Sequence, residues 1–289
     1  MPELPEVETI RRGLNDLILG QDIKKIEVLC EKSCQGRPVL GKVKGLRRFG
    51  KALIIDLDND YSLLIHLRMT GQLIYDGKRK GSSQSGSRYA AGHPSDNFTD
   101  KLPNKQTRII IKLTNGTLFF NDQRKFGFIK FLKTSEIENE PFIKKLAKEP
   151  WQMATEELYA KLQRHKSACI KATILDQTII AGLGNIYADE ALFAAKIHPA
   201  RRSGSLTRKE TELLLKSARE VMDKSIDSGG STMATYVKAD GTKGDYLEKF
   251  ANVFRCEGKP CPRCGTTLIK TRIAGRGTHL CPHCQKESK

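Results

Sequence analysis

Four cysteines near the end of the chain restrict its fold more than any other feature. They form two pairs, Cys261-Pro-Arg-Cys264 and Cys281-Pro-His-Cys284, separated by residues 265–280. Two Cys-x-x-Cys pairs at this separation are typical of a Zn²⁺ site with four thiolate ligands. Disulfides or two redox pairs are the alternative, which the absence of a signal-peptide pattern in residues 1–20 disfavours. We therefore expect one structural Zn²⁺ ion bound by all four cysteines.

The charge of the chain indicates a polyanionic partner. Its 289 residues include 50 Lys and Arg against 33 Asp and Glu, which leaves a net charge of +17. Nucleic acid and an acidic membrane surface are the two candidate partners. No apolar run approaches the ~18 residues that a membrane-spanning helix needs. The sequence thus predicts a soluble, cytoplasmic protein of two domains that does not contact a membrane.

Residues 42–132 carry the pattern of a β-rich domain. Apolar runs with turn signals between them predict strands at 52–57, 62–67, 108–113, 117–121 and 128–132. The strongest turn signal is Asn115-Gly116, which is typical of a two-residue hairpin. Strands this closely spaced indicate a sandwich or barrel. Residues 76–106 are rich in Gly, Ser, Lys and Arg, so we expect a mobile loop there, either a solvated insertion or a contact to the polyanion.

Helical signals stand on both sides of this β-rich stretch. Apolar residues recur at helical spacing between Val7 and Leu17, and Gly20 supplies a stop. Residues 134–150 read as a linker. A helix is then expected from Thr155, and a second one follows the capping box of Thr207 and Glu210.

The glycine-rich turn at 182–184 precedes another run of helix-forming residues. Backbone N–H groups at such a turn suit a phosphate, although glycine turns before helices are common.

The first residues suggest covalent chemistry. Loss of the initiator methionine would free the secondary amine of Pro2, and an α-amino group titrates near ~8. Such an amine can attack a carbonyl-level carbon to form a Schiff base. The adjacent carboxylate of Glu3 can carry the protons that this reaction needs. The alternative is that Pro2 and Pro5 only prepare the start of a helix.

Five segments together resemble the formamidopyrimidine-DNA glycosylase family, and they follow the family's order along nearly the whole chain. They are Pro-Glu-Leu-Pro-Glu-Val-Glu-Thr at 2–9, His-Leu-x-Met-Thr-Gly at 66–71, Arg-Lys-Phe-Gly at 124–127, Gly-Leu-Gly-Asn-Ile-Tyr-Ala-Asp-Glu at 182–190 and the cysteine hairpin. The resemblance implies an α+β protein with an N-terminal β-sandwich flanked by helices. It implies a catalytic domain at 1–135, a linker at 136–150, a helix–two-turn–helix domain at 151–251 and a zinc finger at 252–289.

The same resemblance implies a monomer that excises oxidised purines, such as 8-oxoguanine and formamidopyrimidines, from double-stranded DNA and then cleaves the strand. Pro2 would attack C1′ of the damaged nucleotide and leave an iminium, while Glu3 moves protons at the sugar. Lys51 would assist base loss and β-elimination. Arg276 would grip a phosphate and assist δ-elimination.

Other residues would contact DNA. Met69, Arg124 and Phe126 would fill the space left by the extruded base, with Arg124 facing the opposite cytosine; a core phenylalanine between solvated charges is the alternative reading of residues 124–126. Asn185 would bind a phosphate, and Lys166 would also contact DNA. Segment 228–246 would close over the flipped base.

The sequence departs from the family pattern at two positions that would also lie near DNA. Lys125 replaces the second arginine of the usual motif and keeps its charge without the bidentate geometry. Gln106 stands where a DNA-contacting histidine is usual.

Two other functions remain open. One is the sister class of glycosylases that excises oxidised pyrimidines. Three features favour the purine enzyme over this class: Leu4, the trio of Met69, Arg124 and Phe126, and segment 228–246. The other is a non-catalytic zinc-ribbon protein that only binds DNA. Comparing the release of 8-oxoguanine with that of thymine glycol separates the two glycosylase classes. Covalent trapping on DNA separates both from a protein that only binds DNA.

Overall fold

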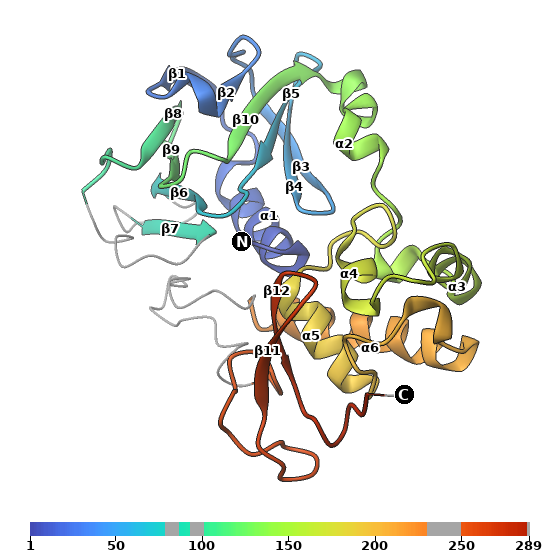
Figure 1. Ribbon diagram of the computed structural model, residues 1–289. Coiled ribbons are helices and arrows are strands. Elements are labelled where there is room, and N and C mark those ends of the chain that lie inside the picture. Colours follow the sequence, from blue (N-terminus) through green and yellow to red (C-terminus); the bar gives the residue numbers. More distant parts are fainter. Residues whose placement is uncertain (79–86, 93–100, 230–249, 288–289) are drawn as a thin grey trace. The chain divides into compact units, whose positions relative to one another are not determined.

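The computed structural model describes residues 1–78, 87–92, 101–229 and 250–287 (Figure 1). The chain divides into two compact units. The first comprises Met1–Lys144 with Ser228–Asp245, and the second comprises Lys145–Asp227 with Tyr246–Lys289. None of the helices in the described ranges has the length and apolar character required to cross a membrane.

The first unit contains one long helix and ten strands among its described residues. They are α1 (Leu4–Ile18), β1 (Ile23–Val28), η1 (Glu31–Ser33), β2 (Cys34–Gln35), β3 (Val43–Phe49), β4 (Ala52–Leu57), β5 (Tyr61–His66), β6 (Gly71–Gly77), β7 (Ser87–Gly92), β8 (Thr107–Leu113), β9 (Gly116–Asp122) and β10 (Phe128–Lys133), followed by η3 (Thr134–Asn139) and α2 (Pro141–Lys144). The strands form two five-stranded sheets, ordered β1-β8-β9-β6-β7 and β2-β10-β5-β4-β3. Pairing is antiparallel except between β2 and β10. The expected α+β architecture with a β-sandwich is confirmed.

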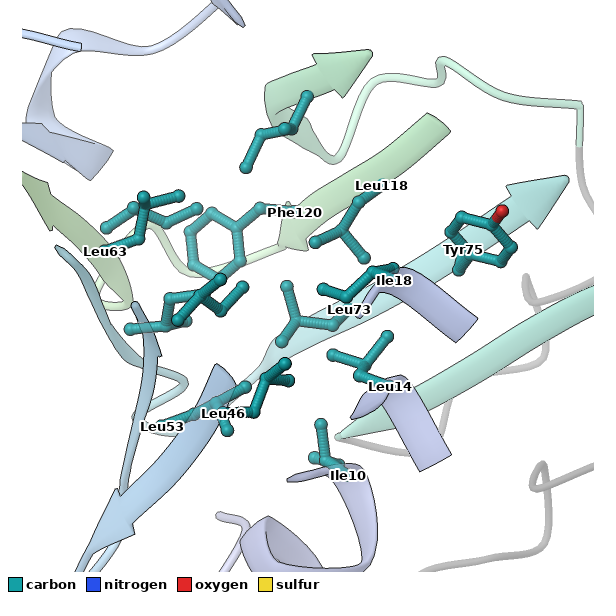
Figure 2. Packing of buried hydrophobic residues seen from close by; sticks show 14 of the residues in the cluster. Ile10, Leu14, Ile18, Leu46, Leu53, Leu63, Leu73, Tyr75, Leu118 and Phe120 are labelled. Carbon is teal, nitrogen blue, oxygen red and sulfur yellow. The ribbon is translucent and has the colours of Figure 1, made fainter. Parts of the chain in front are cut away.

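Helix α1 forms because its sequence meets the helical requirements at both ends and along one face. Pro5 lies in its first turn, where a missing N–H costs nothing, and the Glu3 N–H donates to the Glu6 carboxylate at 2.8 Å. The apolar face joins the central core: Ile10, Leu14 and Ile18 belong to the same cluster of buried residues as Leu73, Leu118 and Phe120 (Figure 2). The helix predicted between Val7 and Leu17 is confirmed.

Strands β4 and β5 are apolar on both faces because both faces are covered. Leu53 and Leu63 point into the central core, whereas Ile54 and Leu64 belong to a second cluster on the other face of the sheet. That cluster is completed by residues of η3 and α2, namely Ile137 and Ile143. The stretch expected to be a linker therefore begins with short helices that pack on the sheet.

The prediction that residues 76–106 are one mobile loop was wrong for β7. This strand pairs with β6, and Tyr89 within it is buried. Its ring passes over Gly13 of α1, where an added Cβ would come 2.3 Å from the Tyr89 hydroxyl oxygen. The hydroxyl donates to the Thr9 carbonyl at 3.3 Å. One aromatic residue thus anchors a strand whose other residues are small or polar.

The second unit is helical, with a zinc-finger-like hairpin. Its elements are η4 (Pro150–Gln152), α3 (Thr155–Arg164), α4 (Ile170–Leu175), α5 (Asn185–Ala194), η5 (Ser203–Ser205), α6 (Arg208–Asp227), β11 (Ile269–Ile273) and β12 (Arg276–Leu280). The Thr207–Glu210 capping box is confirmed, because each residue's side chain accepts from the other's backbone N–H. Helix α5 is buried on nearly all sides, and its buried residues include the charged Asp189 and Glu190.

A turn at 177–179 and a bend at 180–182 join α4 to α5, and one side chain organises this connection. Gln177 accepts from the Gly182 N–H at 2.9 Å and donates to the Leu183 carbonyl at 2.9 Å. Gly182 has a φ of 93°, which a residue with a side chain rarely adopts. The polypeptide thereby reaches the first residue of α5 in a fixed direction.

Candidate active site, DNA-binding residues and metal centre

Pro2 and Glu3 lie immediately before α1. Both residues are buried, and Glu3 is only 3% exposed. The Glu3 carbonyl accepts the first helical hydrogen bond, from Val7 at 3.1 Å. Because the helix is anchored in the core, the predicted nucleophile and its neighbouring carboxylate sit on a rigid support.

Lys51 occupies the tight turn between β3 and β4. Gly50 in this turn has a φ of 53°, and its carbonyl accepts from Arg48 Nη1 at 2.9 Å. On the next strand, His66 lies opposite Ala52. Lys51 therefore projects from the same end of the sheet as His66.

His66 is a site candidate to which the sequence analysis assigns no role, although it lies in the His-Leu-x-Met-Thr-Gly segment at 66–71. Burial, reinforced by the charges of Arg68 and Lys51, lowers its pKa to about 3. Its Nδ1 accepts from the Arg68 N–H at 3.1 Å, which leaves the ring proton on Nε2. His66 is thus a neutral imidazole at physiological pH, able to donate from Nε2 beside Lys51.

The trio predicted to fill a vacated base position is brought together by two loops. Met69 and Phe126 are 41% and 54% exposed, so the alternative of a core phenylalanine is excluded. The Arg124 guanidinium lies 4.9 Å from the centre of the Phe126 ring. Lys125 between them has a φ of 57°. Two large apolar side chains held in water beside an arginine suit insertion into a base stack.

Gln106 lies at the turn before β8. Its N–H donates to Asn104 Oδ1 and its carbonyl accepts from the Asp122 N–H, both at 2.9 Å. Segment 228–246, predicted to close over a flipped base, lies outside the described residues from 230 onward.

In the second unit, two predicted DNA-binding residues lie together. Asn185 is the first residue of α5, and its Nδ2 donates to the Gly277 carbonyl at 2.9 Å. Gly277 follows Arg276, which begins β12 and is exposed. The tip of the hairpin is thereby attached to the N-terminus of α5, where backbone N–H groups favour an anion.

A buried ion pair that the sequence did not reveal reinforces this attachment. Lys171 and Asp189 are fully buried, with 2.6 Å between Lys171 Nζ and Asp189 Oδ1. The same Nζ donates to the Gly277 carbonyl at 2.9 Å and to Thr278 Oγ1 at 2.7 Å, and Asp189 Oδ2 accepts from the His279 N–H at 2.9 Å. Strand β12 is therefore bound to the helical core through charge-assisted hydrogen bonds.

Glu190 anchors the chain that enters the hairpin. It is buried, and its carboxylate accepts backbone N–H bonds from Asn252, Val253 and Phe254 at 2.8–3.1 Å. Lys166, which follows α3, is exposed, and its carbonyl accepts from Gly204 at 3.2 Å.

The four cysteines of the tail meet the requirements of a zinc site. Their Sγ atoms all lie within 4.8 Å of one another, and the Cys261–Cys284 and Cys264–Cys281 separations are 4.0 and 3.5 Å. A tetrahedral ion with Zn–S bonds of about 2.3 Å needs sulfur atoms about 3.8 Å apart. All eight cysteines, which fall within the described ranges, are free thiols rather than disulfides.

The local chemistry also favours a cation. Hydrogen bonds from Thr266 lower the pKa of Cys264 to about 5, which favours the thiolate that binds metal. Burial and hydrogen bonds with the other three thiols raise the pKa of Cys284 to about 12, and a bound cation would offset this rise by stabilising the thiolate. The site fits one structural Zn²⁺ ion.

Known proteins match the chain along nearly its whole length. Residues 1–129 match the formamidopyrimidine-DNA glycosylase N-terminal domain, residues 146–237 match the formamidopyrimidine-DNA glycosylase H2TH domain, and residues 258–286 match the zinc finger found in FPG and IleRS. The formamidopyrimidine-DNA glycosylase of Pelotomaculum thermopropionicum is 39% identical, with 99% of each chain covered. The enzyme of Desulfitobacterium hafniense is 38% identical over 99% of this chain and 100% of the relative.

Solved structures agree with these relatives. A Lactococcus lactis FPG mutant in complex with a Fapy-dG containing DNA matches the structure with a TM-score of 0.84 and 33% sequence identity. The L. lactis enzyme bound non-covalently to an AP site containing DNA matches it with a TM-score of 0.82 and 32% sequence identity. Both alignments cover 99% of this chain and 100% of the solved one. The agreement of sequence, fold and cysteine site shows that the chain belongs to the formamidopyrimidine-DNA glycosylase family.

Proposed function

We propose that this chain, a DNA glycosylase of base excision repair, removes oxidised purines from double-stranded DNA through a Schiff base at Pro2. The observation that carries the proposal is the placement of Pro2 and Glu3 as buried residues at the start of a core-anchored helix. Formation of a terminal iminium needs a fixed amine with a proton carrier beside it, and these two residues supply both.

The covalent step replaces one bond at the sugar by another. The Pro2 nitrogen bonds to C1′ while the C1′–N9 bond breaks, and the electron pair leaves with the base, which takes up a proton. Glu3 moves protons at the sugar as it opens to the iminium. Loss of a C2′ proton then expels the 3′ phosphate, and a second elimination expels the 5′ phosphate.

Lys51 and Arg276 assist the steps in which the base and the two phosphates are expelled. The ammonium of Lys51, held by the β3–β4 turn, assists base loss and the first elimination. Arg276, at the exposed start of β12, grips a phosphate and assists the second elimination. Asn185 and Lys166 bind the DNA backbone and thus keep the strand in register.

DNA must be bent and opened before this chemistry can begin. Extruding a base costs roughly a few kcal/mol, and Met69, Arg124 and Phe126 recover part of that by filling the vacated space. Lys125 adds positive charge beside them. The net charge of +17 supplies affinity that does not depend on sequence.

We further propose that a monomer suffices, with catalysis in 1–135, a linker at 136–150, DNA binding in 151–251 and a zinc finger at 252–289.

Borohydride trapping on duplex DNA containing 8-oxoguanine opposite cytosine tests the proposal. The wild-type protein should form a covalent adduct, and Pro2→Gly should lose it. Mass spectrometry of active protein should show a chain that starts at Pro2. Failure of the wild-type protein to trap any damaged duplex would leave a protein that only binds DNA, and faster release of thymine glycol than of 8-oxoguanine would place it in the pyrimidine class.

A further inference from the structure

Asp122 lies where the two loops that carry the inserted trio leave the sheet. It is the last residue of β9, and it stands opposite Gly71, the first residue of β6. The loop with Met69 therefore ends, and the loop with Arg124 begins, at neighbouring positions at the ends of two paired strands. Asp122 is fully buried at this position, whereas the trio is exposed.

The Asp122 carboxylate binds groups from both loops. Its Oδ1 accepts from the Thr70 hydroxyl and, at 3.1 Å, from the Arg124 N–H. Its Oδ2 accepts from the Gly127 N–H at 2.7 Å. The Arg124 N–H is shared with Thr70 Oγ1 at 3.0 Å. One side chain thus holds the start and the end of the 124–127 turn and ties that turn to the residue after Met69.

The surroundings hold Asp122 itself in place. Its carbonyl accepts from Arg108 Nε at 2.7 Å, and its N–H donates to the Gln106 carbonyl at 2.9 Å. A Cβ on Gly127 would come 2.9 Å from the Phe120 ring and 3.2 Å from Asp122 Oδ2, so glycine is needed for this close approach. The 124–127 turn is consequently formed around the carboxylate, which compensates for the positive φ of Lys125.

We infer that Asp122 and Thr70 are positioning residues that fix Met69, Arg124 and Phe126 relative to one another before DNA arrives. Both act through the backbone of the loops that carry the trio. Pre-ordering spares the enzyme the entropy of arranging two loops during base extrusion. The inference rests on the proposed function, because the orientation of Met69, Arg124 and Phe126 matters only if these residues fill the space left by an extruded base.

Thr70→Val is the sharpest test, because it keeps the shape of the side chain and removes only the hydroxyl. Single-turnover excision of 8-oxoguanine opposite cytosine should fall about 10- to 150-fold, the effect of one lost hydrogen bond to a charged group. Cleavage at a preformed abasic site should change less, because no stacked base has to be extruded. The preference for cytosine over adenine opposite the lesion should narrow, because Arg124 is no longer held.

Three further variants separate positioning from loss of structure. Thr70→Ser restores the hydroxyl and should recover both the rate and the opposing-base preference. Asp122→Asn should resemble Thr70→Val, and if it fails to fold, Thr70→Val decides alone. Ser62→Ala is the matched control, because Ser62 Oγ donates to Asp56 Oδ1 at 2.6 Å in the other sheet, away from the trio. It should leave the opposing-base preference unchanged.

Two results would overturn the inference. One is a Thr70→Val enzyme with wild-type excision and wild-type opposing-base preference. The other is an equal fall in excision and in abasic-site cleavage with an unchanged preference, which general destabilisation would produce. Failure of the wild-type protein to trap an abasic duplex would instead overturn the proposed function, so the two failures are distinguishable.

Discussion

Glu8 of α1 and Arg48 of β3 form an ion pair, with 3.3 Å between Glu8 Oε2 and Arg48 Nε. Arg48 also donates to the Gly50 carbonyl in the turn that carries Lys51. The helix that begins after Pro2 and Glu3 is thereby tied to the turn that holds the predicted catalytic lysine.

Glu8→Gln should therefore destabilise the first unit in a pH-dependent way. Burial would raise the pKa of Glu8, but hydrogen bonds from Arg11 and Arg12 and the charges of Arg11 and Arg48 outweigh it and lower the pKa from 4.5 to about 2. A lowered folded-state pKa contributes stability that is complete above 4.5 and is lost as the pH falls towards 2.

The Glu8→Gln variant should lose about 1–2 kcal/mol of its free energy of unfolding at pH 7. Its free energy of unfolding should also change less with pH in acid than that of the wild type. Urea unfolding followed by circular dichroism measures both. Glu27→Gln is the control, because Glu27 pairs with Lys25 and Lys112 on the surface. An identical acid profile for the Glu8→Gln and wild-type proteins would refute the role assigned to this pair.

Breaking the buried Lys171–Asp189 pair should be costly. Lys171→Met or Asp189→Asn leaves one charge buried without its partner, which costs about 3–5 kcal/mol. The double variant Lys171→Met/Asp189→Leu should recover much of this loss, because no charge remains buried. Urea unfolding measures the three variants. A double variant no more stable than either single one would show that the charges act independently.

Loss of the metal site should affect DNA binding more than the β-sandwich. Cys261→Ala removes one of four thiolates, so the hairpin that carries Arg276 should collapse and affinity for DNA should fall. The first unit has its own core and should keep its hydrogen-exchange protection. Fluorescence anisotropy with duplex DNA measures the affinity, with Cys30→Ala as control. A Cys261→Ala protein that binds DNA like the wild type contradicts this expectation.

Gly204→Ala should weaken DNA binding through Lys166. A Cβ at residue 204 would come 2.3 Å from Lys166 Cβ and 2.8 Å from its Cα, so the backbone at Lys166 must move. If Lys166 binds a phosphate, Lys166→Gln should reduce the slope of log affinity against log salt by about 1, and Gly204→Ala should reduce it similarly. Salt titrations of binding check this. Gly45→Ala, where an added Cβ meets nothing within 4 Å, should leave the slope unchanged.

The elements whose signals lie within a few residues of one another could be predicted from the sequence. Apolar spacing and capping specify α1, and Thr207 with Glu210 specifies the start of α6. The hairpin predicted at Asn115-Gly116 is present as β8–β9, but its turn residues are Thr114 and Asn115, because Gly116 already pairs with Leu113 as the first residue of β9. The spacing of the cysteines specified the zinc site for the same reason, because two short turns present all four ligands. The roles of Pro2, Glu3 and the other site residues stay predictions.

The features that depend on residues far apart in the sequence could be seen only in the folded chain. Strand β7 exists because Tyr89 packs over Gly13, although the composition of its surroundings predicted a loop. Lys171 and Asp189 appear in the sequence as an ordinary surface lysine and aspartate, and only the approach of β12 makes them a buried pair. Thr70 and Asp122 meet because β6 and β9 are neighbours in one sheet. No local pattern records such a pairing, since it arises from the free energy of packing the whole unit.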